Sequence, residues 1–263
     1  MKINFFFISD MALRNFYCLL PVVFSALPVV FSAVSIIKGE LLKVPYDAIS
    51  TKSVNIQEEI VGKHNALRRG VIPRARNMLK MEWNEKAAQN ARNWAKECEM
   101  THSATFKRQI TDIFCGENLL FSSDPLSWSD VIQIWYDESE NFKYGFGPIK
   151  PGLVVGHYTQ TVWSTSYMIG CEVAHCPSRE TYKYFYVCHY CHRGNNPDTS
   201  TPYKKGIPCG DCPHHCEDGL CTNPCAYADD AGNCPDAISS LGCHHKLVAK
   251  SCKASCKCTT EIK

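Results

Sequence analysis

The chain has 263 residues, a formal net charge of +2 at pH 7 and 17 cysteines. A charge so close to zero excludes the electrostatic footprint of a nucleic-acid-binding protein. The arginines at positions 68, 69, 74 and 76 are close in sequence, and we expect them to form a solvated helix end and loop. The sequence contains no Asn-x-Ser/Thr site, so N-glycosylation is not expected.

An apolar segment near the N-terminus, residues 13–37, predicts a signal peptide over residues 1–35. Arg14 and Lys38 flank the segment, and the small residues Ala33 and Ser35 offer a cleavage site. The sequence LPVVFSA occurs twice in tandem here, which lengthens the apolar run and leaves a retained membrane anchor as the alternative. Cleavage would also remove Cys18 and leave sixteen cysteines, an even number suited to eight disulfides.

Two helices are predicted in the first part of the mature chain. One extends from about Asn55 to Gly70, with Asn55 and Glu58 placed as an N-cap and its capping-box partner. Its inner side is marked by Ile56, Ile60 and Leu67. The other extends from Asn84 to about Glu99, and its apolar stripe consists of Ala87, Ala91, Trp94, Ala95 and Cys98. The small residues of this stripe predict close packing.

A third helix is predicted from about Ser129 to Asn141, with Val131, Ile132, Trp135 and Phe142 directed inward. Glu138 lies on the same stripe, where a carboxylate requires an explanation.

After this helix the apolar period changes to two, which predicts strands over residues 168–175 and 182–190. A hairpin centred near Arg179 would place Cys171 directly opposite Cys188, within reach of a cross-strand disulfide. Helices followed by antiparallel strands indicate an α+β fold.

Ten of the 17 cysteines fall between Cys209 and Cys258, in a stretch poor in large apolar side chains. Such a segment needs disulfides to be stable, and this cysteine density is typical of secreted proteins. We therefore predict an extracellular protein. Zinc is the alternative, because Cys188-x-x-Cys191 and Cys209-x-x-Cys212 have metal-ligand spacing.

Several motifs resemble the cysteine-rich secretory protein family. Residues 156–163, GHYTQTVW, are similar to its first signature, and residues 186–190 followed by Gly194-Asn195 are similar to its second. Residues 114–119, residues 135–138 and the tail from Cys225 to Cys258 also resemble the family. The resemblance covers essentially all of the mature chain.

The resemblance implies a three-layer α/β/α sandwich (a CAP domain) over residues 36–196. A cystine-rich hinge over residues 197–224 and a small, toxin-like helical domain over residues 225–263 would follow. It also implies the disulfide pairs Cys98–Cys176, Cys115–Cys191, Cys171–Cys188, Cys209–Cys216, Cys212–Cys221, Cys225–Cys258, Cys234–Cys252 and Cys243–Cys256.

The family gathers two histidines and two glutamates in a cleft of the sandwich, and the matching residues are His102, Glu117, Glu138 and His157. Two imidazoles with adjacent carboxylates have the composition of a zinc site, so zinc is the implied cofactor, one that the fold does not require. The alternative is a hydrogen-bonded network that ties helix to strand. No serine or cysteine nucleophile is evident, and we do not expect an enzyme. The other histidines, His175, His189, His192, His214, His215, His244 and His245, are expected on the solvated surface.

The tail carries candidate contacts for a channel mouth: Lys246, Leu247, Lys250, Lys253 and Lys257. Their alternative role is to keep a small domain soluble. The resemblance implies a secreted binding protein that regulates cation channels, calcium channels in particular, or binds a sperm or egg surface protein. Roles in sperm maturation, capacitation or gamete interaction would follow. A metal-dependent hydrolase, a carrier of sterol or lipid and an innate-defence protein are the alternatives. No membrane span is expected after signal cleavage.

Overall fold

The computed structural model describes residues 44–192, 194–195 and 198–263. The predicted signal peptide lies outside these residues. Within the described ranges, no helix is both long enough and apolar enough to cross a membrane.

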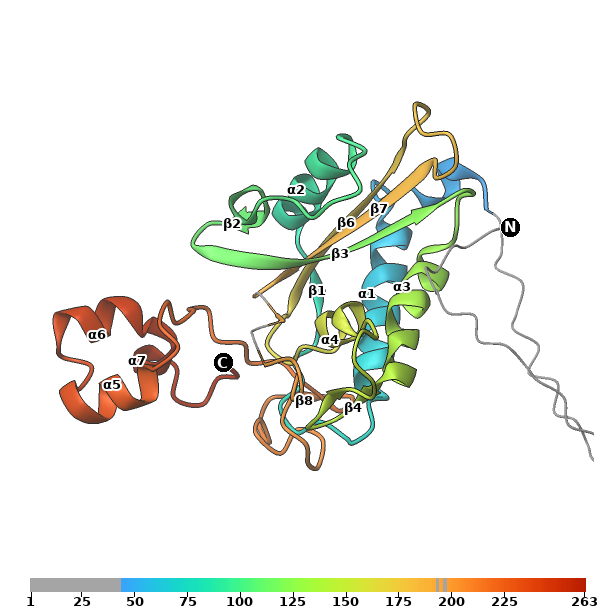
Figure 1. Cartoon of the computed structure of the whole chain (residues 1–263). Coiled ribbons are helices and arrows are strands. Elements are labelled where there is room, and N and C mark those ends of the chain that lie inside the picture. Colours follow the sequence, from blue (N-terminus) through green and yellow to red (C-terminus); the bar gives the residue numbers. More distant parts are fainter. Residues whose placement is uncertain (1–43, 193, 196–197) are drawn as a thin grey trace, which may run out of the picture. The chain divides into compact units, whose positions relative to one another are not determined.

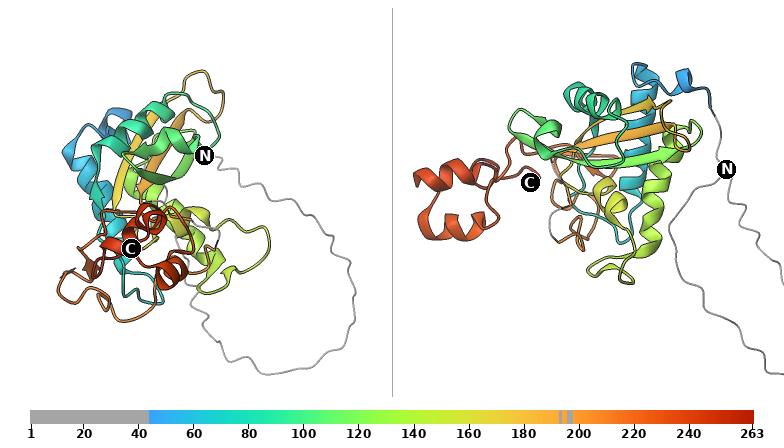
Figure 2. Two further views of the ribbon diagram at one scale, coloured as in Figure 1. Left: turned by 90° about the vertical axis from the view of Figure 1, so that its left-hand side faces the viewer. Right: turned by 45° about the horizontal axis from the view of Figure 1, so that its top comes forward.

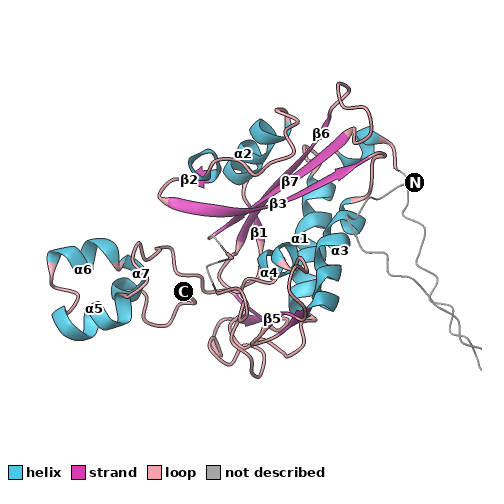
Figure 3. Cartoon of the chain, viewed as in Figure 1, coloured by secondary structure: helices cyan, strands magenta, loops and turns pink. Residues whose placement is uncertain are grey.

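A five-stranded sheet forms the centre of the fold, with strand order β1-β6-β7-β3-β2 (Figures 1 and 3). Its long strands are β3 (Ile113–Ser122), β6 (Met168–His175) and β7 (Tyr184–Cys191), and its short ones are β1 (Glu82–Trp83) and β2 (Gln109–Ile110). Strand β1 pairs with β6 in parallel, while the other neighbours are antiparallel. The sheet is therefore mixed, with one parallel pair at its edge.

Helices cover both faces of this sheet (Figure 1). Helix α2 (Glu85–Ala95) lies on one face, and α1 (Val54–Arg69), α3 (Trp128–Asp137) and α4 (Gly156–Thr161) lie on the other. Side chains along β7 point alternately to the two faces of the sheet and so contact both helical layers. Phe185 and Val187 pack against α2, while Tyr186 contacts Trp128 of α3. The result is the predicted α/β/α sandwich of the α+β class.

The predicted hairpin agrees closely with the structure. Strand β6 has the predicted bounds, β7 begins two residues later than predicted, and Cys171 lies directly opposite Cys188. Strand β3 and helix α4 occur where the sequence pattern predicted no element. Shorter elements also occur: η1 (Tyr46–Ile49), η2 (Thr105–Arg108), η3 (Glu138–Asn141), β4 (Phe142–Lys143) and β5 (Gly147–Pro148).

The helix ends differ from the predictions by up to four residues. Helix α1 is preceded by Ser53 rather than capped by Asn55. Helix α2 starts as predicted, because the Asn84 side chain accepts a hydrogen bond from the Ala87 amide at 2.9 Å, but it ends at Ala95. Helix α3 is capped by Ser127 and continues as the 3₁₀ turn η3 through Glu138.

The predicted close packing of α2 occurs against β6. Ala87, Ala88 and Ala91 are fully buried, and Gly170 of β6 faces Ala87 and Ala88. A Cβ atom at position 170 would stand 2.0 Å from the Ala88 amide nitrogen, so only glycine permits this approach. The helix backbone thus rests directly on the strand.

The prediction that Arg68 is solvated is wrong. Its side chain is buried and donates to the carbonyl oxygens of Leu79, Thr161, Trp163 and Ser164 at 2.8–3.2 Å. Burial lowers the pKa of Arg68 to about 9. The guanidinium satisfies otherwise unpaired carbonyls in two loops, and so ties α1 to the end of α4.

The hinge and the terminal lobe follow β7. The hinge contains the hairpin of β8 (Cys216–Glu217) and β9 (Leu220–Cys221), and the lobe contains α5 (Cys234–Leu241), α6 (Lys246–Ser251) and α7 (Lys253–Lys257), drawn in red in Figure 2. Each of the eight disulfides has the pairing that the family resemblance implied. The zinc alternative for Cys188-x-x-Cys191 and Cys209-x-x-Cys212 is therefore wrong, because these sulfurs bond to other cysteines.

Replacing Gly170 by alanine should destabilise the sandwich. We expect Gly170→Ala to lower the free energy of unfolding by about 1–3 kcal/mol, because the added methyl group overpacks the α2–β6 contact. Gly62 is the matched control, since it is exposed on α1 and a Cβ there would meet nothing within 4 Å. Gly62→Ala should stabilise by about 0.5–1 kcal/mol. Guanidinium unfolding with disulfides intact measures both, and equal effects would contradict the packing argument.

Candidate functional site

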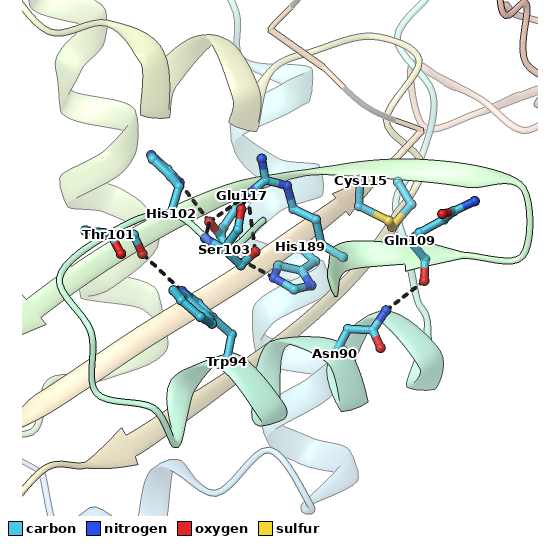
Figure 4. A network of polar contacts seen from close by, with 11 residues as sticks. Asn90, Trp94, Thr101, His102, Ser103, Gln109, Cys115, Glu117 and His189 are labelled. Atoms are coloured by element: carbon cyan, nitrogen blue, oxygen red, sulfur yellow. Dashed lines mark hydrogen bonds and ion pairs between the residues drawn. A yellow bond between two sulfur atoms is a disulfide. The ribbon is translucent and has the colours of Figure 1, made fainter. Parts of the chain in front are cut away.

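Two neighbouring strands and one loop build the first half of the site. The loop containing His102 and Ser103 lies against α2, which holds it at both ends (Figure 4). Trp94 donates from Nε1 to the Thr101 carbonyl at 3.1 Å, and Asn90 donates from Nδ2 to the Gln109 carbonyl at 2.9 Å. These two bonds fix the loop beside β3.

Glu117 of β3 is the centre of this half (Figure 4). Its side chain is 1% exposed. The carboxylate accepts hydrogen bonds from His102 Nδ1 at 2.8 Å, the Ser103 amide at 2.9 Å, Ser103 Oγ at 2.7 Å, Arg108 Nη1 at 2.9 Å and His189 Nε2 at 3.0 Å. Since a carboxylate offers about four lone-pair positions, these donors occupy its acceptor capacity.

The donors also keep Glu117 ionised. Burial alone would raise the pKa of the Glu117 carboxyl, but the hydrogen bonds from His102, His189 and Ser103 outweigh burial and hold that pKa well below its usual range. The Arg108 guanidinium supplies a positive charge at 2.9 Å. The site thus contains a fixed buried anion.

His189 lies opposite Glu117 in the β3–β7 pairing and is 0% exposed. The prediction of a solvated His189 is therefore wrong. Burial lowers the pKa of His189 by more than the adjacent Glu117 raises it, so the ring is neutral. Its Nε2–H donates to Glu117, and within the described part of the chain its buried Nδ1 has no hydrogen-bond partner.

Glu138 and His157 form the second half of the site. His157 Nδ1 donates to Glu138 Oε1 at 2.6 Å. Glu138 Oε2 accepts the backbone amides of His157 and Tyr158 at 2.8 and 3.2 Å, so the carboxylate also caps the first turn of α4. This double role explains why the apolar stripe of the predicted third helix ends in a glutamate.

Asn118 connects the second half to the sheet. It follows Glu117 in β3 and points to the opposite face, where its Nδ2 donates to the His157 carbonyl at 3.0 Å and to the Tyr190 hydroxyl at 3.3 Å. The Tyr190 hydroxyl bonds His64 Nε2 at 3.0 Å, and His64 Nδ1 donates to the Ile60 carbonyl at 2.8 Å. Burial lowers the pKa of His64 to about 3, which keeps this ring neutral.

The two site histidines present the same chemistry. Each ring uses Nδ1–H to donate to a glutamate, which leaves the Nε2 lone pair available in the neutral ring. Within the described part of the chain, neither Nε2 has a hydrogen-bond partner, and the side chains of His102 and His157 are 61% and 30% exposed. A carboxylate behind each imidazole is the arrangement that metal-binding histidines use. Each of the two pairs therefore offers one imidazole with the chemistry of a metal ligand.

The glutamates do not complete a cage of ligands. Among the described residues, the cluster that brings three ligand atoms within 4.8 Å of one another is Cys209, Cys212 and Cys221, all in disulfides. The structure pairs His102 with Glu117 and His157 with Glu138, and both carboxylates orient imidazoles.

The sequence patterns missed Ser103, Arg108, Asn118, Tyr190 and His189 as members of this network. A signal existed for two of them, because the Cys115–Cys191 disulfide implied by the family resemblance places the strands that carry Asn118 and His189 side by side. Of the other histidines, His175, His214, His215 and His244 are exposed, while His192 and His245 are half-buried.

The candidate channel contacts lie in the terminal lobe. Lys246, Leu247 and Lys250 are exposed on α6, and Leu247 retains 69% of its accessible surface. Lys253 is half-buried, and Lys257 lies over the Tyr227 ring at 4.3 Å. The three α6 residues thus form an outward group with two positive charges and one apolar side chain.

Sequence comparisons match both parts of the chain. The family description "Cysteine-rich secretory protein family" matches residues 61–190, and "Crisp" matches residues 209–263. Cysteine-rich secretory protein 2 of Cavia porcellus is 52% identical over 218 residues, which cover 82% of this chain and 89% of that protein. Cysteine-rich secretory protein 1 of Macaca mulatta is 48% identical over 248 residues, covering 94% and 95%. The chain belongs to the cysteine-rich secretory protein family.

This cysteine-rich secretory protein also resembles a solved structure. The crystal structure of NaASP2 with Zn²⁺ is 30% identical in sequence and gives a TM-score of 0.54, with 65% of this chain and 96% of that chain covered. Family membership and the eight disulfides fit an extracellular protein.

Acid should destabilise the protein through its buried neutral histidines. The folded-state pKa values of His64 and His189 are lowered, so both contribute stability above the unfolded value of 6.5 that is lost as pH falls below it. For His64 this window extends from 6.5 to about 3. Each histidine should contribute a slope of about 1.4 kcal/mol per pH unit to the free energy of unfolding.

Denaturant unfolding between pH 7 and pH 4.5 measures this slope. His64→Gln retains one donor and one acceptor but cannot be protonated. It should reduce the slope of the unfolding free energy by about 1.4 kcal/mol per pH unit. His214→Gln, at an exposed hinge position, is the matched control. An unchanged slope in His64→Gln would show that this ring is not neutral in the folded state.

Proposed function

We propose that this protein is secreted and acts, without enzymatic activity, as a regulator of cation channels on the sperm surface. The proposed targets are calcium channels, and the proposed processes are sperm maturation, capacitation or gamete interaction. The observation that carries the proposal is the terminal lobe. Its three disulfides, Cys225–Cys258, Cys234–Cys252 and Cys243–Cys256, are all internal, and α6 presents Lys246, Leu247 and Lys250 outward.

A lobe built in this way suits a channel mouth. Its cross-links order the chain before binding, so little conformational entropy is lost on association. A lysine ammonium can enter a cation pathway, and an adjacent exposed leucine can bury apolar area against the vestibule. The Crisp description matches residues 209–263, which include the whole lobe, and two mammalian cysteine-rich secretory proteins are 52% and 48% identical to this chain.

The contacts of the site residues support a non-enzymatic interpretation. A hydrolase that acts through its own side chains requires a nucleophile or a general base with a free lone pair. Ser103 is 3% exposed and donates its hydroxyl proton to Glu117. Glu117 accepts five hydrogen bonds and Glu138 accepts three, so both carboxylates are engaged in holding imidazoles and amides.

Substitution of the α6 group in the full-length protein tests the proposal. We expect Lys246→Ala, Leu247→Ser and Lys250→Ala together to reduce inhibition of calcium entry into sperm by about tenfold or more, the loss typical of a binding hot spot. The matched control is Lys143→Ala, Phe146→Ser and Lys150→Ala, which removes two exposed lysines and one exposed apolar residue from the sandwich. Patch-clamp recording and calcium imaging provide the readouts. A loss of inhibition in the control alone would assign the activity to the sandwich.

Zinc binding is the second candidate property, favoured by the two available Nε2 atoms. We expect one Zn²⁺ to bind His102 and His157, with an affinity that falls as pH drops through about 6.5 because a protonated imidazole cannot ligate. Calorimetric titration of His102→Ala/His157→Ala should show loss of this site. Glu138→Gln should weaken it by about 10- to 100-fold, as expected for a residue that orients a ligand. His214→Ala is the control, and unchanged zinc affinity in the double variant would refute the assignment.

A further inference from the structure

One cysteine differs from the other fifteen described disulfide partners. Cys216 is exposed, whereas each of the others is buried or half-buried. Its partner Cys209 is 6% exposed, and the neighbouring pair, Cys212 and Cys221, is 2% and 0% exposed. An external thiolate must reach a sulfur in order to attack it, so accessibility selects Cys216.

The hinge hairpin keeps Cys216 at the surface. Strands β8 and β9 are joined by Asp218-Gly219, both with positive φ (48° and 79°), as a tight hairpin turn requires. Asp218 pairs with Arg69, and Glu217 pairs with Lys80, so the hairpin is held against the sandwich. Backbone bonds from the Cys221 amide to the Met78 carbonyl and from the Lys80 amide to the Cys221 carbonyl (2.7 and 2.8 Å) fix the inner strand.

The sulfurs of two different disulfides meet beneath this hairpin. Cys209, Cys212 and Cys221 have Sγ atoms that all lie within 4.8 Å of one another. Cys209 therefore stands beside both sulfurs of the Cys212–Cys221 bond, although it is bonded to Cys216. The Cys212 amide donates to the Cys209 carbonyl at 3.0 Å, so a single turn already brings these two residues together.

We propose that Cys216 is a thiol–disulfide exchange site and that exchange there passes inward to the Cys212–Cys221 disulfide. An external thiolate attacks Cys216 Sγ, forms a mixed disulfide and releases the Cys209 thiolate. The Cys209 thiolate attacks Cys212 Sγ, forms Cys209–Cys212 and releases the Cys221 thiolate. Each step breaks one S–S bond and forms another, so no net oxidation or reduction occurs.

A third exchange can complete the cycle. Cys221 lies directly opposite Cys216 in the hairpin. Its thiolate can attack Cys216, form Cys216–Cys221 and expel the external thiol unchanged. The hinge thus alternates between two pairings, Cys209–Cys216 with Cys212–Cys221 and Cys209–Cys212 with Cys216–Cys221. These are two of the three pairings that four cysteines allow, and the external thiol catalyses their interconversion.

The test uses the oxidised full-length protein and two thiol probes. Reduced glutathione represents a small thiol, and thioredoxin with its resolving cysteine replaced by serine represents a protein thiol. Reactions are quenched with acid, free thiols are alkylated, and the sites are identified by peptide mass spectrometry. At early times we expect about tenfold more adduct at Cys216 than at any other cysteine, with the alkylated thiol at Cys221. At later times we expect Cys209–Cys212 and Cys216–Cys221.

The two probes distinguish the source of the thiol. Adduct with glutathione assigns the site to small thiols, and adduct with thioredoxin alone assigns it to protein partners. Failure of both probes to react at Cys216, or faster reaction elsewhere, would overturn the proposal. Cys243–Cys256, whose sulfurs belong to half-buried residues of the lobe, is the internal reference.

A variant tests the inward step separately. In Cys212→Ser/Cys221→Ser the acceptor disulfide is absent, so the alkylated thiol should remain on Cys209. Circular dichroism, together with mapping that finds the six disulfides outside the hinge unchanged, verifies that the variant folds. Alkylation of Cys209 in the wild-type protein, with Cys212–Cys221 unchanged, would show that exchange stops at the surface.

Discussion

The register of β3 against β7 is the constraint on which the rest of the site depends. Cys115 lies opposite Cys191 and is bonded to it, so the two strands cannot slip relative to each other. Because side chains alternate along a strand, a shift by one residue would exchange the two faces. In the observed register Glu117 meets His189 on the α2 face, and Asn118 meets Tyr190 and α4 on the other. One covalent link therefore positions the residues on both faces of the sheet.

Two carboxylates orient the imidazoles of the site, Glu117 that of His102 and Glu138 that of His157. Glu117 is buried and anionic because five donors converge on it, and among these donors only His102 extends to solvent to any large degree. Glu138 also accepts a hydrogen bond from an imidazole, that of His157, and the same carboxylate caps α4. In both cases stability and ligand geometry rest on the same hydrogen bonds. Removing either glutamate would leave buried donors unpaired, at a cost of about 1–3 kcal/mol each.

The sequence predicted those elements whose apolar period is unbroken. Strands β6 and β7 alternate regularly and were placed within two residues, with the Cys171–Cys188 register correct. Strand β3 was missed because Gly116, Glu117 and Asn118 interrupt its apolar pattern, and Glu117 and Asn118 are residues that build the site. Arg68 and His189 were assigned to solvent because side-chain chemistry alone does not reveal a partner distant in sequence. The disulfide pairing came from family resemblance, since sequence spacing alone leaves many connectivities open.

The disulfides contribute differently to stability in the sandwich, the lobe and the hinge. The sandwich bonds join segments 17 to 78 residues apart and fasten a sheet that also has an apolar core. The lobe contains few large buried side chains besides Val248, so its three bonds supply most of its order. The hinge bonds close short loops of 7 and 9 residues and stabilise less by chain entropy, because that contribution grows with loop length. The hinge is therefore the segment where disulfide connectivity can change with the smallest effect on global stability.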